Sequence, residues 1–194
     1  MGEILREENR ALRKELGGLA TEDVEESPYQ LERFQRYLWI AAAKAGYNPD
    51  NLTDSQEEEL LDDWESKRER FLDEEPAEEA QELMFEALEE GREADWEDWK
   101  ITQSVQAALI KDALELDPAN VDALTLQAKL AFDQIEDEDV TGFRLLHESV
   151  RKAREALGPD FFSKHSERLH SRVEAKPFLR ALSALAEFRS RALG

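Results

Sequence analysis

The sequence contains no cysteine and only three histidines, His147, His165 and His170. Without cysteine there is no disulfide bond, no thiolate metal ligand and no cysteine nucleophile. His165 and His170 are five residues apart, a spacing that does not place both on one helix face, and no HExxH pattern occurs. A glycine-rich phosphate loop and a GxSxG turn are also missing. We therefore expect no enzymatic activity, no cofactor and no metal ion.

Long hydrophobic runs and strand-like patterns are absent as well. No apolar run approaches the roughly 20 residues that cross a bilayer, and the first residues lack the apolar core of a signal peptide. Together with the lack of cysteine, this predicts a cytoplasmic protein without a membrane partner. No segment alternates apolar and polar residues with β-branched enrichment, so we expect an all-α fold.

Basic residues are scarce relative to acidic ones. The 194 residues include 46 Asp and Glu against 25 Lys and Arg, a net charge of −21, of which −19 falls within residues 1–100. Such a chain is repelled by phosphate backbones, so we expect no nucleic-acid partner. Solvated helix faces are the simplest interpretation of the acidic runs. The alternative is an acidic surface that mimics a nucleic acid and occupies a basic protein surface.

Most of the six prolines and eight glycines lie where helices are expected to begin or end. Ser27 before Pro28, with Gln30 three residues on, indicates a capped helix that stops at Gly46. Thr53 and Gln56 open a second helix by the same device. Further helices are expected over 77–91, 94–116, 119–134, 140–157, 160–175 and 176–193. Short connections between them predict antiparallel neighbours.

The first helical segment, residues 3–16, has a zipper-like pattern. Leu5, Leu12 and Leu19 are seven residues apart, with Asn9 and Leu16 between them. Two heptads are too short to dimerise strongly alone. We assign residues 1–74 to an acidic helical N-terminal region and leave open a homodimer through this helix.

An internal repeat is visible after residue 75. An alanine–leucine pair, then an acid and a proline, closes one helix in "DALELDP". The pair and the proline recur in "EALGP", where a glycine precedes the proline. Small residues then open the next helix in "ANVDALTLQAKLA", where Ala123 and Ala128 flank the bulky Leu124. Small side chains allow close approach of two helices, and a bulky one fills the groove between them.

In this order and spacing, "EPAEEAQELMFEALEEG", "ALELDPANVDALTLQAKLA", "EALGPDFF" and "EAKPFLRALSALAEF" resemble a bacterial family of tetratricopeptide-type proteins related to the eukaryotic suppressor-of-tumorigenicity proteins. The resemblance covers about residues 75–194. It implies antiparallel helical hairpins stacked as a tetratricopeptide-like right-handed superhelix. Lys176 departs from the family pattern, which has an arginine there, and the family continues into a further repeat after the last helix. The apolar face of that helix is therefore expected to be exposed or covered by another chain.

The segment "VEAKPFLRALSALAEF" could belong to an active site or to the scaffold. Pro177 suits the first turn of a helix, where its missing N–H costs nothing. We interpret Glu174 and Arg180 as a hydrogen-bonded pair that orients this helix rather than as substrate ligands.

These observations predict a protein–protein interaction scaffold or adaptor that binds its protein partner on the concave face of the stacked hairpins. By the resemblance, that face carries Asp122, Thr125, Lys129, Arg180, Ser183 and Glu187. The alternatives are the acidic mimic and a homo-oligomeric assembly subunit that pairs through its N-terminal or C-terminal helix.

Overall fold

The computed structural model describes residues 27–62, 71–93, 99–134 and 139–193. All regular structure in these ranges is helical, which confirms the all-α class. The zipper-like segment 3–16 lies outside the described residues. No helix in the described ranges is long and apolar enough to cross a membrane.

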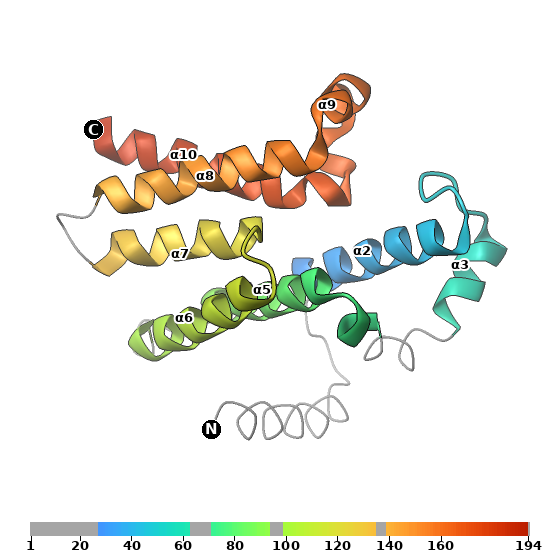
Figure 1. Ribbon diagram of the computed structural model, residues 1–194, viewed down its shortest axis with the longest axis horizontal. Helices are drawn as coiled ribbons and strands as arrows, with labels where there is room; N and C mark the ends of the chain where they lie inside the picture. Colours follow the sequence, from blue (N-terminus) through green and yellow to red (C-terminus); the bar gives the residue numbers. More distant parts are fainter. Residues whose placement is uncertain (1–26, 63–70, 94–98, 135–138, 194) are drawn as a thin grey trace.

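Two antiparallel helical hairpins and a final single helix form the body of the protein (Figure 1). The first hairpin consists of α5 (Pro76–Glu93) and α6 (Trp99–Leu116), and the second of α7 (Val121–Gln134) and α8 (Asp139–Leu157). The last helix, α10 (Lys176–Leu193), packs on both α7 and α8, while α6 packs on α7. Each unit therefore lies against the next along the chain.

Small residues at the seams make this packing close. Ala123 and Ala128 are fully buried on opposite sides of α7. Ala123 joins a cluster with α5 and α6, and Ala128 joins one with α8 and α10. The prediction that residues 119–157 form two packed antiparallel helices around these alanines is confirmed.

The helices of the N-terminal part begin and end at the capping residues and the glycine that the sequence predicted. The helix α2 (Pro28–Ala45) is capped by the Ser27 hydroxyl, which accepts a hydrogen bond from the Tyr29 amide at 3.2 Å. It ends at Gly46, whose φ of 79° is the left-handed conformation that glycine adopts at little cost. The helix α3 (Asp54–Leu61) packs against α2, and its capping box is present, with the Thr53 amide donating to Gln56 Oε1 at 2.9 Å.

Two expectations about helix ends are wrong. Gly91 does not end α5, which continues to Glu93. A Cβ at position 91 would collide with the Gln106 side chain of α6, so this glycine allows α5 and α6 to approach closely. Residues 160–175 do not form one helix but a short α9 (Pro159–His165) and two 3₁₀ turns, η1 (Ser166–Ser171) and η2 (Val173–Ala175). Tertiary contacts such as the edge-on packing of Phe162 against Phe178 hold α9 against α10.

Gly142 of α8 faces the ring of Phe132 on α7, and a Cβ at this position would lie 2.5 Å from the ring. We therefore expect Gly142→Leu to lower the free energy of unfolding by about 1–3 kcal/mol through overpacking. The exposed neighbour provides the control, because Thr141→Leu is expected to change stability by less than about 0.5 kcal/mol. Urea unfolding followed by circular dichroism measures both; equal midpoints for the two variants would contradict the close approach.

Candidate functional site

The first helices of the hairpins, α5 and α7, and the final helix α10 form one side of the body, here called the first-helix face. Buried polar side chains line it. Gln81 of α5 donates to Asp122 Oδ2 at 2.8 Å, and Asn120 donates to Gln81 Oε1 at 3.4 Å. Asp122 is only 3% exposed. A buried carboxylate is tolerated because hydrogen bonds and a counter-charge compensate its lost hydration.

Arg180 of α10 supplies that counter-charge. Its guanidinium donates hydrogen bonds to Asp122 from Nε and Nη2, at 2.7 and 2.5 Å. It also donates to Glu32 of α2 from Nη1 and Nη2, at 2.6 and 2.9 Å. Burial alone would lower the pKa of Arg180, but the charges and hydrogen bonds of Asp122 and Glu32 outweigh it and raise that pKa above its usual range. The group is therefore a permanent cation that ties α2, α7 and α10 together.

Further ion pairs attach α2 to α5. Arg36 makes a bidentate contact with Glu78 at 2.5 and 2.7 Å. Arg33 lies 3.3 Å from both Glu82 and Glu89, with its guanidinium 5.4 Å from the Phe85 ring centre. Thus α2 lies on the first-helix face through several charged contacts, and its Tyr29 ring packs near the buried Phe85 of α5.

The structure places the six predicted partner-binding residues in two groups. Asp122 and Thr125 are buried, and Arg180 is mostly covered by its carboxylate partners. Thr125 donates to the Val121 carbonyl at 2.7 Å and shares a 2.5 Å hydrogen bond with the Ser149 hydroxyl. Asp122 and Arg180 form an ion pair with each other and are not presented on an open surface.

The other three, Lys129, Ser183 and Glu187, are exposed. Glu187 pairs with Arg191 one turn later on the same helix, at 2.6 Å. A role for these three residues in binding a partner stays a prediction.

The expected pair between Glu174 and Arg180 does not form. Glu174 instead accepts from Arg172 Nη2 at 2.7 Å, and Arg172 also contacts Asp50 after α2. Arg180 is directed away toward α7 and α2, because the carboxylates of Asp122 and Glu32 lie there. Two arginines therefore attach this segment to the rest of the fold: Arg172 pairs with Glu174 and Asp50, and Arg180 pairs with Asp122 and Glu32.

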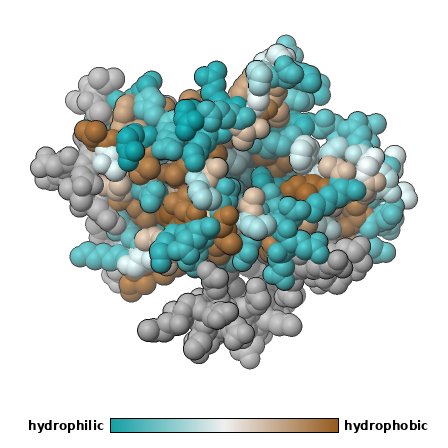
Figure 2. Space-filling view, viewed as in Figure 1, coloured by the Kyte–Doolittle hydropathy of each residue, from teal (hydrophilic) through white to brown (hydrophobic). Residues whose placement is uncertain are grey.

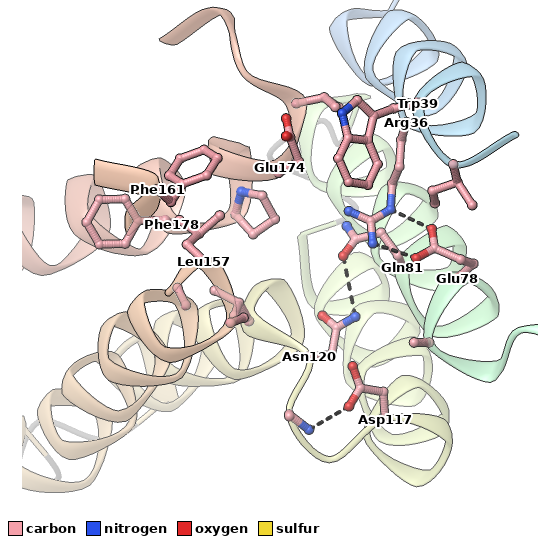
Figure 3. Close-up of a pocket in the computed structure, with 18 residues that line it drawn as sticks. Arg36, Trp39, Glu78, Gln81, Asp117, Asn120, Leu157, Phe161, Glu174 and Phe178 are labelled. Atoms are coloured by element: carbon pink, nitrogen blue, oxygen red, sulfur yellow. Dashed lines mark hydrogen bonds and ion pairs between the residues drawn. The ribbon is translucent and has the colours of Figure 1, made fainter. Parts of the chain in front are cut away.

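Beside the ion pairs lies an open groove of about 510 Å³. Its apolar walls come from distant parts of the chain: Trp39 and Ile40 of α2, Leu157 at the end of α8, and Phe161 and Phe178 of α9 and α10. Figure 3 shows Trp39 on one side of the cavity and Phe161 and Phe178 across from it.

The groove lining also includes polar residues. Its polar members are Arg36, Glu78, Gln81, Asp117, Asn120 and Glu174. Within the described part of the chain, Glu174 Oε2 is buried without a hydrogen-bond partner, so it can still accept one. The groove lining therefore combines apolar and polar side chains.

Four residues of this site were not predicted from the sequence: Glu32, Arg36, Glu78 and Trp39. The charged residues read as ordinary solvated helix positions, since alternating charges along a helix face usually indicate solvent exposure. The i, i+4 spacing of Glu32 and Arg36 on an amphipathic helix was the one local sign of a charged seam.

No three histidine, aspartate or glutamate side chains of the described ranges converge into a metal-binding group. No family model matches the chain, and no curated protein or solved structure is significantly similar to it.

Proposed function

We propose that this chain is a protein-recognition scaffold with tetratricopeptide-like helical hairpins, and that its groove binds an apolar side chain of a partner peptide. The observation that carries the proposal is the groove itself, whose apolar walls are contributed by α2, α8, α9 and α10. Concave, mostly apolar sites with a few placed polar groups are the usual form of binding sites in proteins.

The size of the groove and its lining describe the expected ligand. A cavity of about 510 Å³ accommodates one or two large apolar side chains. The aromatic walls of Trp39, Phe161 and Phe178 favour an aromatic or long aliphatic anchor.

The architecture supports the same proposal. The order of packing, in which α6 lies on α7 and α8 lies on α10, is the arrangement that stacked helix pairs use to build a continuous binding surface. Figure 2 shows hydrophilic residues covering most of the visible surface, with hydrophobic residues showing between them.

Selection of a random-peptide library displayed on phage against the full-length chain tests the proposal. We expect enriched peptides that share an aromatic or aliphatic anchor. Their affinity should fall at least tenfold, about 1.4 kcal/mol, in Leu157→Glu, which places a charge in the groove. The matched control is Leu182→Glu, an exposed leucine of α10 outside the groove, which should leave binding unchanged.

A library that yields no enriched peptide, or peptides that bind both variants equally, would contradict the groove assignment. Light scattering tests the assembly alternative, for which Leu182, 43% exposed on the final helix, offers an apolar contact. The acidic-mimic alternative receives less support around α2, because Glu32, Glu78, Glu82 and Glu89 are engaged by arginines within the chain.

A further inference from the structure

The helix α2 is attached to the body by a different kind of contact from those that hold the hairpins together. One apolar cluster joins α5, α6 and α7, and a second joins α7, α8 and α10, and neither contains a residue of α2. On the side of α2 that meets α10, α7 and α5, the contacts include the ion pairs of Glu32, Arg33 and Arg36 and the packing of the Tyr29 ring near the buried Phe85 of α5. Leu31, beside Glu32, stays 54% exposed.

Two of these contacts, the ion pairs of Arg33 and Arg36, depend more on salt than the apolar clusters do, whereas the pair of Glu32 with Arg180 is buried. Ion pairs that keep contact with water contribute little each and weaken as salt rises, since the screening length falls from about 10 Å at 0.1 M to about 3 Å at 1 M. The side chains of Arg33 and Arg36 are 17% and 25% exposed. Release of α2 would therefore leave both apolar clusters of the hairpins intact.

The surface beneath α2 has a definite charge pattern. Arg180 keeps Asp122 as one partner, and its second carboxylate position, now filled by Glu32, would be vacant. On α5, Glu78, which meets Arg36, and Glu89, which meets Arg33, would lose these partners. The face thus presents one cation on α10 and two acids on α5.

A helix fits this pattern when it carries an acid followed by basic residues one and four positions later, as Glu32, Arg33 and Arg36 do. We propose that the first-helix face is a binding site for a partner helix with this acid–base pattern, and that α2 occupies the site as an internal competitor. This inference rests on the proposed protein-recognition function and names its partner class. A tethered segment competes at an effective concentration of about millimolar, so α2 sets the affinity threshold that a partner must exceed.

The test uses a fluorescein-labelled peptide of residues 27–47 as the probe and fluorescence anisotropy as the readout. The host is the full-length chain with Glu32→Gln, Arg33→Gln and Arg36→Gln, which weakens the internal competitor. We expect the probe to bind this variant at least tenfold more tightly than wild type. A second peptide with the residues at positions 32 and 36 exchanged has the same composition and should bind the variant at least tenfold more weakly.

Equal binding of the two peptides would overturn the proposal, as would no binding to a variant whose circular dichroism spectrum matches wild type. A second measurement keeps the proposal testable if the triple variant does not fold. Because the chain has no native cysteine, Gln35→Cys with Ser183→Cys, both at exposed positions, accepts a dye pair at defined sites. Excess unlabelled 27–47 peptide should lower energy transfer between the dyes, whereas the exchanged peptide should not; unchanged transfer with both would also overturn the proposal.

The other segment that could occupy the first-helix face is α2 of a second copy of the chain. Light scattering on wild type should give the mass of one chain; a dimer that dissociates when the 27–47 peptide is added would overturn the proposal in favour of exchange between copies. Failure of the peptide library with success of the 27–47 probe rejects the groove function alone. The reverse outcome rejects the helix site alone.

Discussion

Replacing Arg180 by methionine is expected to lower the free energy of unfolding by about 3–5 kcal/mol. The variant removes the cation shared by Asp122 and Glu32, whose side chains are 2% and 9% exposed. Loss of one partner of a buried ion pair is costly because the remaining charge is neither hydrated nor neutralised. Asp122 would keep only its hydrogen bonds, including the one from Gln81.

Urea unfolding followed by circular dichroism measures this loss. The matched control is Arg151→Met: Arg151 forms an exposed i, i+4 pair with Glu155 at 2.7 Å, and its removal should cost less than about 0.5 kcal/mol. Adding Asp122→Asn to the Arg180 variant should restore part of the stability, since a neutral amide is less costly to bury than an unpaired carboxylate. A loss below about 1 kcal/mol for Arg180→Met would show that the network contributes little to stability.

Replacing Leu146 by alanine should have a comparable effect by a different mechanism. Leu146 is fully buried in the cluster where α7, α8 and α10 meet, beside Ala128 and Leu185. Truncation removes apolar burial and leaves a cavity, for which the expected loss is about 2.7–5 kcal/mol. Because no charge is involved, this loss should be the same at 0.1 M and 1 M salt.

Leu182→Ala is the control for this second variant, since the same truncation on exposed α10 surface should cost less than about 1 kcal/mol in a monomer. Unfolding at two salt concentrations compares the variants. A loss of less than about 1 kcal/mol for Leu146→Ala would contradict the close packing of α8 on α10. A large loss for Leu182→Ala would indicate that another copy covers this leucine.

Much of the secondary structure followed from local rules. Ser27, Thr53 and Gly46 delimit helices because a side-chain cap or a left-handed glycine acts within a few residues of itself. The hairpin of α7 and α8 was also predictable, since the small residues Ala123 and Ala128 recur on the faces of one amphipathic helix. The stacking of these hairpins as a tetratricopeptide-like superhelix stays a proposal.

The charged network was beyond such rules. Glu32 and Arg180 are 148 positions apart, and in a chain with 46 acidic residues every arginine has many candidate partners. Glu174 is the acid nearest to Arg180 in the sequence, yet it pairs with Arg172. Burial selects among the candidates, because only carboxylates removed from water gain strongly from a specific cation.

Local sequence was therefore sufficient for the helical class, for several helix ends and for the lack of recognisable catalytic motifs. Only the tertiary structure shows that Asp122 and Thr125 are buried and that α2 packs on the first-helix face. The groove beside Trp39 also depends on how distant helices pack together. Helix formation depends on neighbours three or four residues away, whereas burial of a charge or an aromatic wall depends on which distant helices meet.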